Sequence, residues 1–271
     1  VEGIKVWSIY SYYNFFWRAY RSLYNPQTVK RVAEIIEEVK LDIVHAHNIH
    51  TYLSYHILRI AKKSGAKVFL TAHDVQLFHY GKLTEVNYKV SVWQQIKRAG
   101  KTYNPFRNII IRYYLKCVDK IFAVSDALKE ALAQNGITNV ATVHNGIDVS
   151  AWTVNNAAVQ NFKEKYNIQG KKVILFGGRL GWLKGGREIC LAMEDIIKKA
   201  PDAILLLAGE VGGEVKEILN FAAGLGIDKN IIAAGWLSGD ELKAAYHVAN
   251  IVTAPSICFD SFPTINLEAM A

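Results

Sequence analysis

The sequence lacks long apolar runs and contains little cysteine or proline. Of its 271 residues, 3 are Cys and 5 are Pro. The longest apolar runs, such as residues 203–209, have the length of a strand and fall far short of the roughly 20 residues that a membrane-spanning helix needs. The first residues lack the basic region followed by an apolar region that marks a secretory signal. Cys117, Cys190 and Cys258 are far apart and have no metal-ligand spacing, so we expect three reduced thiols in a cytoplasmic protein.

Length and composition are those of a globular protein. The chain is 51% hydrophobic and 21% charged, which argues against disorder. At roughly 100–200 residues per domain, its length predicts two domains. The chain begins at Val1 and stops at Ala271 within a segment that is typical of a helix. We therefore expect both ends to be cuts through a longer protein, whose natural N-terminus and any signal on it lie outside this sequence.

Positive charge is concentrated in the first half of the chain. Residues 1–150 contain 20 Lys and Arg against 11 Asp and Glu, whereas residues 151–271 contain 12 against 13. A basic face can attract nucleic acid, anionic lipid or a phosphorylated ligand. Composition alone does not choose among these partners.

Short apolar segments alternate with amphipathic segments along the chain. Helical periodicity predicts helices at 27–40, 51–63 and 186–199, and Ser125 is a good N-cap for another. The expected strands are residues 41–47, 67–72, 120–124, 140–143, 173–176, 203–207, 231–234 and 251–254. Continuous apolar strands joined by helices indicate α/β domains with parallel sheets that helices cover on both faces.

The domain boundary is expected at HNGID, residues 144–148, which precedes a polar stretch and a fresh strand–helix start. This gives domains of residues 1–148 and 149–271. We predict two Rossmann-like parallel-sheet domains that face each other across a cleft, both incomplete. Each domain should bind ligand at the carboxyl ends of its strands.

A glycine-rich turn, FGGRLGWLKGG over residues 176–186, follows one expected strand and precedes a helix. Glycines such as Gly178 let backbone N–H groups approach an anion, and a helix N-terminus favours negative charge. Arg179 and Lys184 would add two positive charges, so the turn could bind a diphosphate and stabilise the charge that develops as it leaves a sugar. The alternative is an ordinary turn with two solvated cations. The spacing matches neither a P-loop nor a dinucleotide fingerprint.

Two carboxylates follow the last expected strand. Asp260 and Glu268 are separated by seven residues in PSICFDSFPTINLEAMA, residues 255–271. Pro263 suits the first turn of a helix, which would present free N–H groups near Thr264 and Ile265 and place Glu268 one turn further on. We expect the carboxylates to accept hydrogen bonds from ribose and hexose hydroxyls. The alternative is a capped helix with surface acids.

The order and spacing of these segments resemble family-4 glycosyltransferases of the GT-B fold. The family's C-terminal domain is matched by FGGRLGWLKGG, LLLAGE, residues 233–256 and FDSFPTINLEAMA, and its N-terminal domain by LDIVHAHN, FLTAHD, IFAVSDALKEAL and VHNGID. The resemblance runs from about Tyr24 to Ala271. It implies a retaining enzyme that transfers a sugar from a nucleotide-diphosphate sugar to a glycan, lipid or small-molecule acceptor, without a metal or other cofactor.

The resemblance also implies roles for individual residues. Arg179 and Lys184 would hold the donor diphosphate and neutralise the leaving group, and Gly178, Thr264 and Ile265 are predicted to bind the donor beside them.

Glu268 matches the second acid of the family's Glu-(seven residues)-Glu motif, which binds the nucleotide ribose. Asp260 takes the place of the first acid, which contacts the transferred sugar. Because Asp is one methylene shorter than the usual Glu, this contact would be weaker, water-mediated or suited to another sugar. His73 matches a histidine of the N-terminal domain that reaches the donor sugar, so the implied catalytic set is His73, Arg179, Lys184 and Asp260.

His45, His47 and His50 suggest a metal site, because two histidines two apart on a strand share a face. However, the sequence has no Asp-x-Asp motif and no third ligand of convincing spacing, so we expect no metal. Arg179 and Lys184 would supply the positive charge instead.

Two aromatic and basic stretches, residues 6–24 and 97–112, leave a membrane contact open. Either could lie in a membrane interface, or the first could pack against missing N-terminal strands, which we favour. We expect a cytoplasmic protein, with peripheral contact at the inner face of the membrane as the open alternative, and no nucleic-acid partner. Two other functions stay open: another GT-B enzyme, such as a nucleotide-sugar epimerase or a phosphorylase, and a non-catalytic basic surface-binding module.

Overall fold

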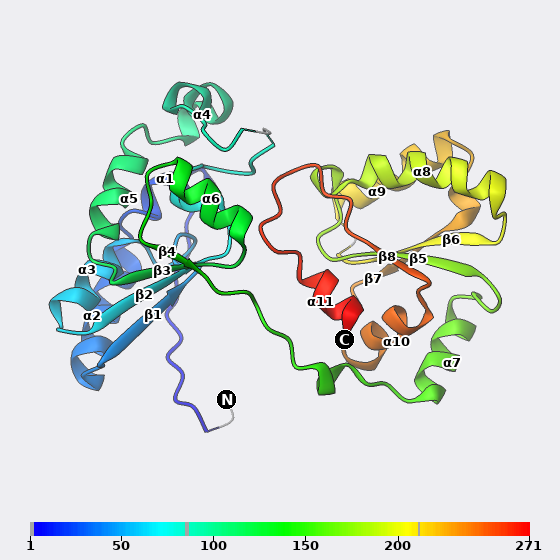
Figure 1. Cartoon of the computed structure of the whole chain (residues 1–271), viewed down its shortest axis with the longest axis horizontal. Helices are drawn as coiled ribbons and strands as arrows, with labels where there is room; N and C mark the ends of the chain where they lie inside the picture. Colours follow the sequence, from blue (N-terminus) through cyan, green and yellow to red (C-terminus); the bar gives the residue numbers. More distant parts are fainter. Residues whose placement is uncertain (1–2, 85–86, 211) are drawn as a thin grey trace. The chain divides into compact units, whose positions relative to one another are not determined.

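A computed structural model of the protein describes residues 3–84, 87–210 and 212–271. The chain divides into two compact units, Val1–His144 (the N-unit) and Asn145–Ala271 (the C-unit). Each unit contains a four-stranded parallel sheet with helices packed on it (Figure 1). In the described part of the chain, no helix has the length and apolar content that crossing a membrane requires.

The N-unit sheet has the strand order β1-β2-β3-β4. Its strands are β1 (Ile43–His47), β2 (Lys67–Ala72), β3 (Lys120–Ala123) and β4 (Val140–Thr142). Its helices are α1 (Arg18–Arg21), α2 (Pro26–Val39), α3 (His56–Lys63), α4 (Val92–Ala99), α5 (Arg107–Leu115) and α6 (Asp126–Gln134). α3 packs on β2 and is flanked by α2 and α5, whereas α6 packs on β3 and β4.

Local capping explains where two of these helices begin. The Asn25 side chain accepts a hydrogen bond from the backbone N–H of Gln27, and Pro26 occupies the first helical position of α2. The Ser125 side chain accepts from the N–H of Leu128 at the start of α6, as the sequence predicted.

The helix predicted over 51–63 begins only at His56, so that prediction is wrong for residues 51–55. Tertiary hydrogen bonds hold the backbone of this segment in another conformation. The Asn25 amide donates to the carbonyl of Tyr52 at 2.5 Å, the Tyr13 hydroxyl donates to the carbonyl of Thr51, and the N–H of Tyr55 donates to the carbonyl of Ser22 at 2.7 Å. These partners lie far away in sequence, so local periodicity could not reveal them.

Helix α4 was not predicted, although the sequence carries its start signal. The Ser91 hydroxyl accepts from the N–H of Gln94, and the Gln94 side chain accepts from the N–H of Ser91. This reciprocal capping box satisfies two backbone donors that the first helical turn leaves without partners.

The C-unit sheet has the strand order β7-β6-β5-β8. Its strands are β5 (Lys172–Gly177), β6 (Ala203–Ala208), β7 (Ile231–Gly235) and β8 (Ile251–Thr253). Its helices are α7 (Asn156–Lys165), α8 (Gly186–Lys199), α9 (Gly213–Gly224), α10 (Gly239–Val248) and α11 (Thr264–Met270), and the short 3-10 turn η5 (Trp182–Lys184) precedes α8.

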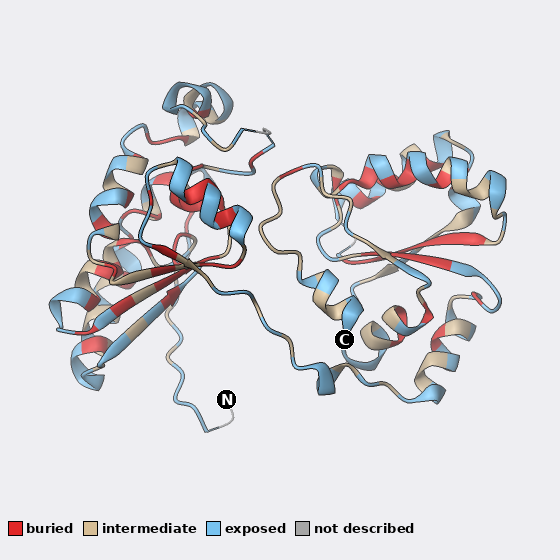
Figure 2. Ribbon diagram, in the orientation of Figure 1, coloured by how far each residue is buried: buried red, intermediate tan, exposed pale blue. Residues whose placement is uncertain are grey.

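Helices cover both faces of the C-unit sheet. Val173 and Leu175 of β5 pack in one core cluster with residues of α7 and α10, whereas Ile174 and Phe176 pack in another with residues of α8 and α9. Figure 1 shows these two helix pairs on opposite faces, and Figure 2 shows the buried strands between them. Burial of a side chain of this size stabilises the folded state by about 1.5–3 kcal/mol. A strand with apolar side chains on both faces gains this free energy on each face only when helices cover both faces of the sheet.

The strand order places a topological switch between β5 and β8. The chain adds β6 and β7 on one side of β5 and then returns to add β8 on its other side. At such a reversal the connections leave the carboxyl ends of the two strands in opposite directions, which creates a crevice where ligands bind in open α/β sheets. The glycine-rich turn follows β5 and the two carboxylates follow β8, so the topology brings both to this crevice.

Candidate functional site

The loops after β5 and β8 are joined by backbone hydrogen bonds. The N–H groups of Ile257 and Cys258 donate to the carbonyl of Leu183 at 3.1 and 3.3 Å. Gly185 has a φ of 89°, and a Cβ there would lie 2.0 Å from the carbonyl oxygen of Pro255. Only glycine meets both conditions without strain. Two segments that are some 70 residues apart in the sequence therefore form one structure.

Lys184 and Asp260 form an ion pair at this junction. The Lys184 ammonium donates to the Asp260 carboxylate, which also accepts from the Ser256 hydroxyl at 3.1 Å. The two charged side chains are only 21% and 23% exposed. Arg179 lies exposed on the same turn and makes no ion pair or side-chain hydrogen bond with any residue that the structure describes. The fold thus brings together a predicted cation and a predicted acid, and leaves a second cation open to solvent.

A carboxylate from α9 braces the glycine-rich turn. Glu214 accepts a hydrogen bond from the backbone N–H of Trp182 at 3.1 Å, and a Cβ at Gly181 would lie 2.0 Å from the same carboxylate oxygen. Glu217 accepts from the Trp182 indole N–H at 2.8 Å. Neither acid was predicted from the sequence, because Glu214 and Glu217 lie 32 and 35 positions after Trp182.

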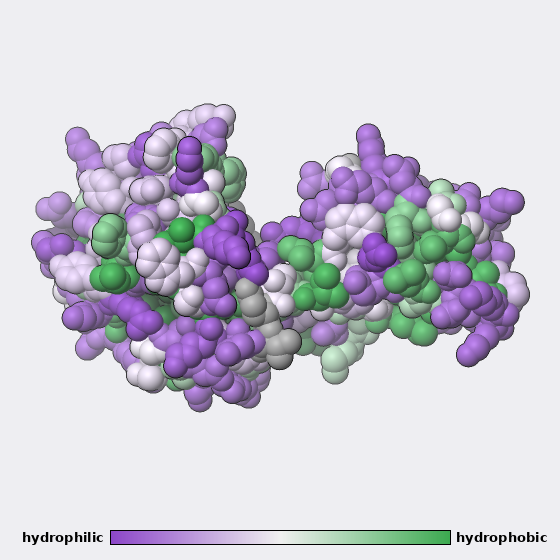
Figure 3. Space-filling model, turned by 90° about the horizontal axis from the view of Figure 1, so that it is seen from above, coloured by the Kyte–Doolittle hydropathy of each residue, from purple (hydrophilic) through white to green (hydrophobic). Residues whose placement is uncertain are grey.

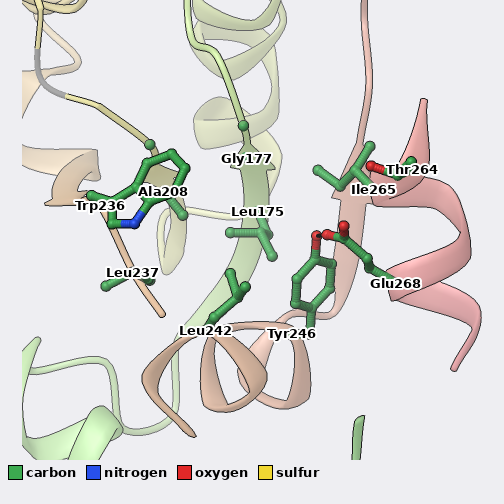
Figure 4. A pocket seen from close by; sticks show the side chains of 12 residues that line it. Leu175, Gly177, Ala208, Trp236, Leu237, Leu242, Tyr246, Thr264, Ile265 and Glu268 are labelled. Atoms are coloured by element: carbon green, nitrogen blue, oxygen red, sulfur yellow. Dashed lines mark hydrogen bonds between the residues drawn. The ribbon is translucent and has the colours of Figure 1, made fainter. Parts of the chain in front are cut away.

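A pocket of about 190 Å³ lies beside this junction, at the carboxyl ends of the strands. Gly178, Thr264, Ile265 and Glu268, four of the six predicted donor-binding residues, line it. Arg179 and Lys184 do not line it, although they belong to the turn that begins at its wall. Figure 4 shows Thr264, Ile265 and Glu268 on one side of this C-unit pocket and Trp236 on the other.

Tyr246 was missed, although it holds one of the predicted acids. Its hydroxyl donates to the Glu268 carboxylate, and Figure 4 shows the two side chains next to each other in the wall of the C-unit pocket. Burial, and next that carboxylate, raise the pKa of the Tyr246 hydroxyl, so it stays a protonated donor at every physiological pH. The edge of Trp152 packs against the tyrosine ring at 5.2 Å between centroids. Tyr246 belongs to the segment 233–256, which carried part of the resemblance without a role for any single residue.

Trp236 is another residue of the pocket wall for which the sequence predicted no role. It follows β7 and is 69% exposed, a large exposed fraction for an indole that lines a pocket. An open aromatic face at the mouth of a pocket is suited to stacking against a planar group.

His73 lies in the N-unit, directly after β2, within a cluster of histidines. Its Nε2 lies 2.9 Å from Nδ1 of His47, and the rings of His47 and His45 are 4.3 Å apart. The prediction that His45 and His47 share a face is therefore confirmed. Burial, and next the neighbouring histidines, lower the pKa of His47. Burial also lowers the pKa of His73, against an opposing effect of Asp74. Among the described residues, no group of three His, Cys, Asp or Glu side chains could hold a metal ion.

His50 should make folding stability depend on pH. Burial lowers the pKa of His50 to about 4, and Arg18 and Arg107 contribute to the lowering while Asp74 opposes it. Between the unfolded value near 6.5 and about 4, only the unfolded chain binds a proton at this position, so the native state loses stability as pH falls. We expect this residue to remove about 3 kcal/mol from the free energy of unfolding over that range.

Urea unfolding of the wild type and of His50→Asn across this pH range measures the effect. Groups that do not contact His50 titrate equally in both proteins, so the difference between their pH profiles reports on His50 and its ion-pair partner Asp74. Parallel profiles would show that His50 ionises normally in the folded protein.

Family models match both units. A model described as Glycosyltransferase Family 4 matches residues 3–151, and one described as Glycosyl transferases group 1 matches residues 158–271. An uncharacterized glycosyltransferase, MJ1607, of Methanocaldococcus jannaschii is 30% identical over 65% of this chain and 47% of its own length. A putative glycosyltransferase, YtcC, of Bacillus subtilis is 28% identical over 57% of this chain and 41% of its own length. The chain thus spans about half the length of these two curated relatives.

Solved structures share the fold at low sequence identity. The crystal structure of Anabaena HepE in complex with UDP superposes with a TM-score of 0.67 at 15% identity, over 89% of this chain and 60% of that one. Sucrose-phosphate synthase of Thermosynechococcus elongatus gives a TM-score of 0.67 at 16% identity, over 90% of this chain and 57% of that one.

Proposed function

Because the chain belongs to glycosyltransferase family 4 and has the GT-B fold, we propose that the protein transfers a sugar from a nucleotide-diphosphate sugar to an acceptor with retention of anomeric configuration. The observation that carries the proposal is the junction at the β5–β8 switch point. There a glycine-rich turn with two cations is hydrogen-bonded to the loop that holds Asp260 and leads to Glu268.

The C-unit pocket suits the nucleoside of the donor. Its volume of about 190 Å³ is below the roughly 300–1000 Å³ of pockets that enclose a complete drug-sized ligand, so it would hold the base and ribose only. Glu268 would accept hydrogen bonds from ribose hydroxyls, with its orientation fixed by Tyr246, and Trp236 offers a face for the base. HepE, a protein of this fold, forms complexes with UDP and with UDP-glucose, and these complexes support a nucleotide-sugar donor.

The diphosphate would lie over the glycine-rich turn. Gly178 has a φ of 99°, and a Cβ there would meet nothing within 4 Å, so the backbone is open on that side. Arg179 is free to pair with a phosphate, and the Lys184 ammonium has three donors, of which Asp260 uses one. Asp260 would then accept a hydroxyl of the transferred sugar while it keeps its bonds to Lys184 and Ser256.

In the proposed reaction the bond from the anomeric carbon to the diphosphate oxygen breaks as the acceptor oxygen bonds to the same face of that carbon. The departing diphosphate oxygen takes the proton of the acceptor hydroxyl. Arg179 and Lys184 would stabilise the charge that develops on the diphosphate, which is the type of interaction that lowers a barrier most. His73 is proposed to contact the donor sugar. The proposed acceptor is a glycan or a lipid-linked molecule, and the proposed location is cytoplasmic.

Thermal unfolding with UDP, GDP and ADP sugars tests the donor proposal. A ligand at 100 times its dissociation constant stabilises the folded state by about 2.7 kcal/mol, which raises the melting temperature measurably. Tyr246→Phe should reduce the shift, whereas Glu241→Gln, on the same helix but paired with Lys165, should not. No stabilisation by any nucleotide sugar would contradict the proposal.

Product analysis separates the alternatives. Release of free nucleotide and sugar without an acceptor would indicate an epimerase, and a requirement for inorganic phosphate would indicate a phosphorylase. RNA binding with a steep salt dependence and no nucleotide-sugar affinity would indicate a basic binding module.

Removal of divalent metal should leave activity unchanged. Arg179 and Lys184 supply the positive charge that a divalent ion gives other sugar transferases, so EDTA should change the turnover of the complete enzyme by less than about twofold. The measurement is steady-state transfer with and without EDTA. Activity that vanishes with EDTA and returns with magnesium or manganese would overturn this mechanism.

A further inference from the structure

A surface of the N-unit exposes large apolar side chains on two neighbouring helices. At the start of α4, Val92 is 39% and Trp93 80% exposed. At α5, the N-cap residue Phe106 is 65% exposed, and Ile109 and Tyr113 of the helix are 67% and 50% exposed. Their spacing of three and four residues puts them on one face of that helix.

These residues belong to one continuous surface, the α4–α5 surface. Val92 of α4 and Ile109 of α5 line the same hollow, whose volume is about 570 Å³. The other side of α5 is anchored in the core: Tyr114 hydrogen-bonds His56 at 3.1 Å, and the Arg107 guanidinium donates to Gln76. The outward side chains are therefore presented by a helix that cannot turn them inward. Figure 3 looks down on the end of the N-unit that carries α4 and shows apolar side chains between hydrophilic ones at the surface.

The segment that carries α4 and α5 is charged with one sign. Residues 87–118 contain seven Lys and Arg and no Asp or Glu. Lys89 and Arg112 line the hollow, and exposed Lys116 lies one turn after Arg112 as the C-cap residue of α5. Gln134 and Asn135, at the C-terminal end of α6, form another part of the wall, and the Gln134 amide donates to the Glu130 carboxylate one turn earlier.

We propose that the α4–α5 surface binds the surface of an anionic lipid bilayer. Exposed aromatic side chains lie favourably at the headgroup level, and Lys and Arg attract anionic lipids. The hollow is lined mainly by apolar surface, with Lys89 and Arg112 in its wall, so a lipid phosphate could pair with these cations while the apolar side chains contact the lipid. The phosphates of a nucleic-acid backbone could also pair with these cations. However, such a backbone would leave exposed aliphatic side chains such as Val92 and Ile109 without an apolar partner.

Flotation of the chain with vesicles tests the proposal. Vesicles of equimolar phosphatidylcholine and phosphatidylglycerol should bind it, and vesicles of phosphatidylcholine alone should not. Lys89→Gln combined with Lys116→Gln should weaken binding roughly 25-fold, because each charge near an anionic membrane contributes about fivefold. Lys171→Gln combined with Lys229→Gln removes the same charge from exposed positions of the C-unit and should leave binding unchanged.

A second pair of variants tests the apolar contribution. Trp93→Ser with Ile109→Ser should weaken vesicle binding, whereas Val149→Ser with Leu191→Ser, exposed apolar residues of the C-unit, should not. Equal binding to neutral and anionic vesicles would overturn the proposal. It would also be overturned if the C-unit control variants lost as much vesicle binding as the variants of the α4–α5 surface. Failure to bind either kind of vesicle would overturn the proposal as well. Binding of oligouridylate, a single-stranded RNA, without binding of vesicles would indicate a nucleic-acid surface instead. Circular dichroism of each variant verifies folding.

Discussion

Lys184→Ala is expected to lower the turnover of the complete enzyme by about 100- to 1000-fold, the usual effect of removing one electrostatic donor from a developing charge. The ammonium lies at the junction of the two loops and is only 21% exposed, so water cannot replace it well. Stability should change by no more than about 1 kcal/mol, because an ion pair that is partly open to solvent contributes little and Asp260 keeps the Ser256 hydrogen bond.

Two further variants make the result specific. Lys171→Ala removes an exposed cation at the amino end of the same strand β5 and should leave turnover unchanged. Asp260→Asn tests whether Lys184 acts only by orienting Asp260, in which case both variants would lose the same turnover. Steady-state kinetics with urea unfolding of each variant measures both effects. Near-wild-type turnover of Lys184→Ala would show that this lysine is an ordinary structural residue.

Glu268→Ala should chiefly raise the Michaelis constant for the donor, by about 10- to 100-fold. Hydrogen bonds to a charged group contribute about 1.5–3 kcal/mol, and a ribose makes them equally in the ground state and the transition state, so turnover should hardly change. Tyr246→Phe should raise the same constant less, since it removes only the hydroxyl that orients the carboxylate.

Glu241→Gln provides the matched control, because Glu241 lies on α10 with Tyr246 but pairs with Lys165. Donor titrations under steady-state conditions with all three variants give the constants. A fall in turnover at an unchanged Michaelis constant would place Glu268 at the reacting centre and not at the ribose.

The elements of this fold follow largely from local sequence. Strand β2 has the predicted bounds, and α8 begins and ends at the predicted residues Gly186 and Lys199. The apolar runs and helical periodicities that define such elements lie within a few residues of one another. The late start of α3 was not predictable in this way, because its cause lies in hydrogen bonds that residues 51, 52 and 55 make with residues 13, 25 and 22.

The chemical character of the site was likewise readable, but its geometry was not. The sequence by itself determined a glycine-rich turn with Arg179 and Lys184 after one strand and two acids after another, because the ends of parallel strands are sequence-local features. Only the tertiary structure decided that Lys184 pairs with Asp260 and that Tyr246 holds Glu268. Those pairings join residues 76 and 22 positions apart, and they depend on the strand order β7-β6-β5-β8, which long-range packing selects and no local pattern encodes.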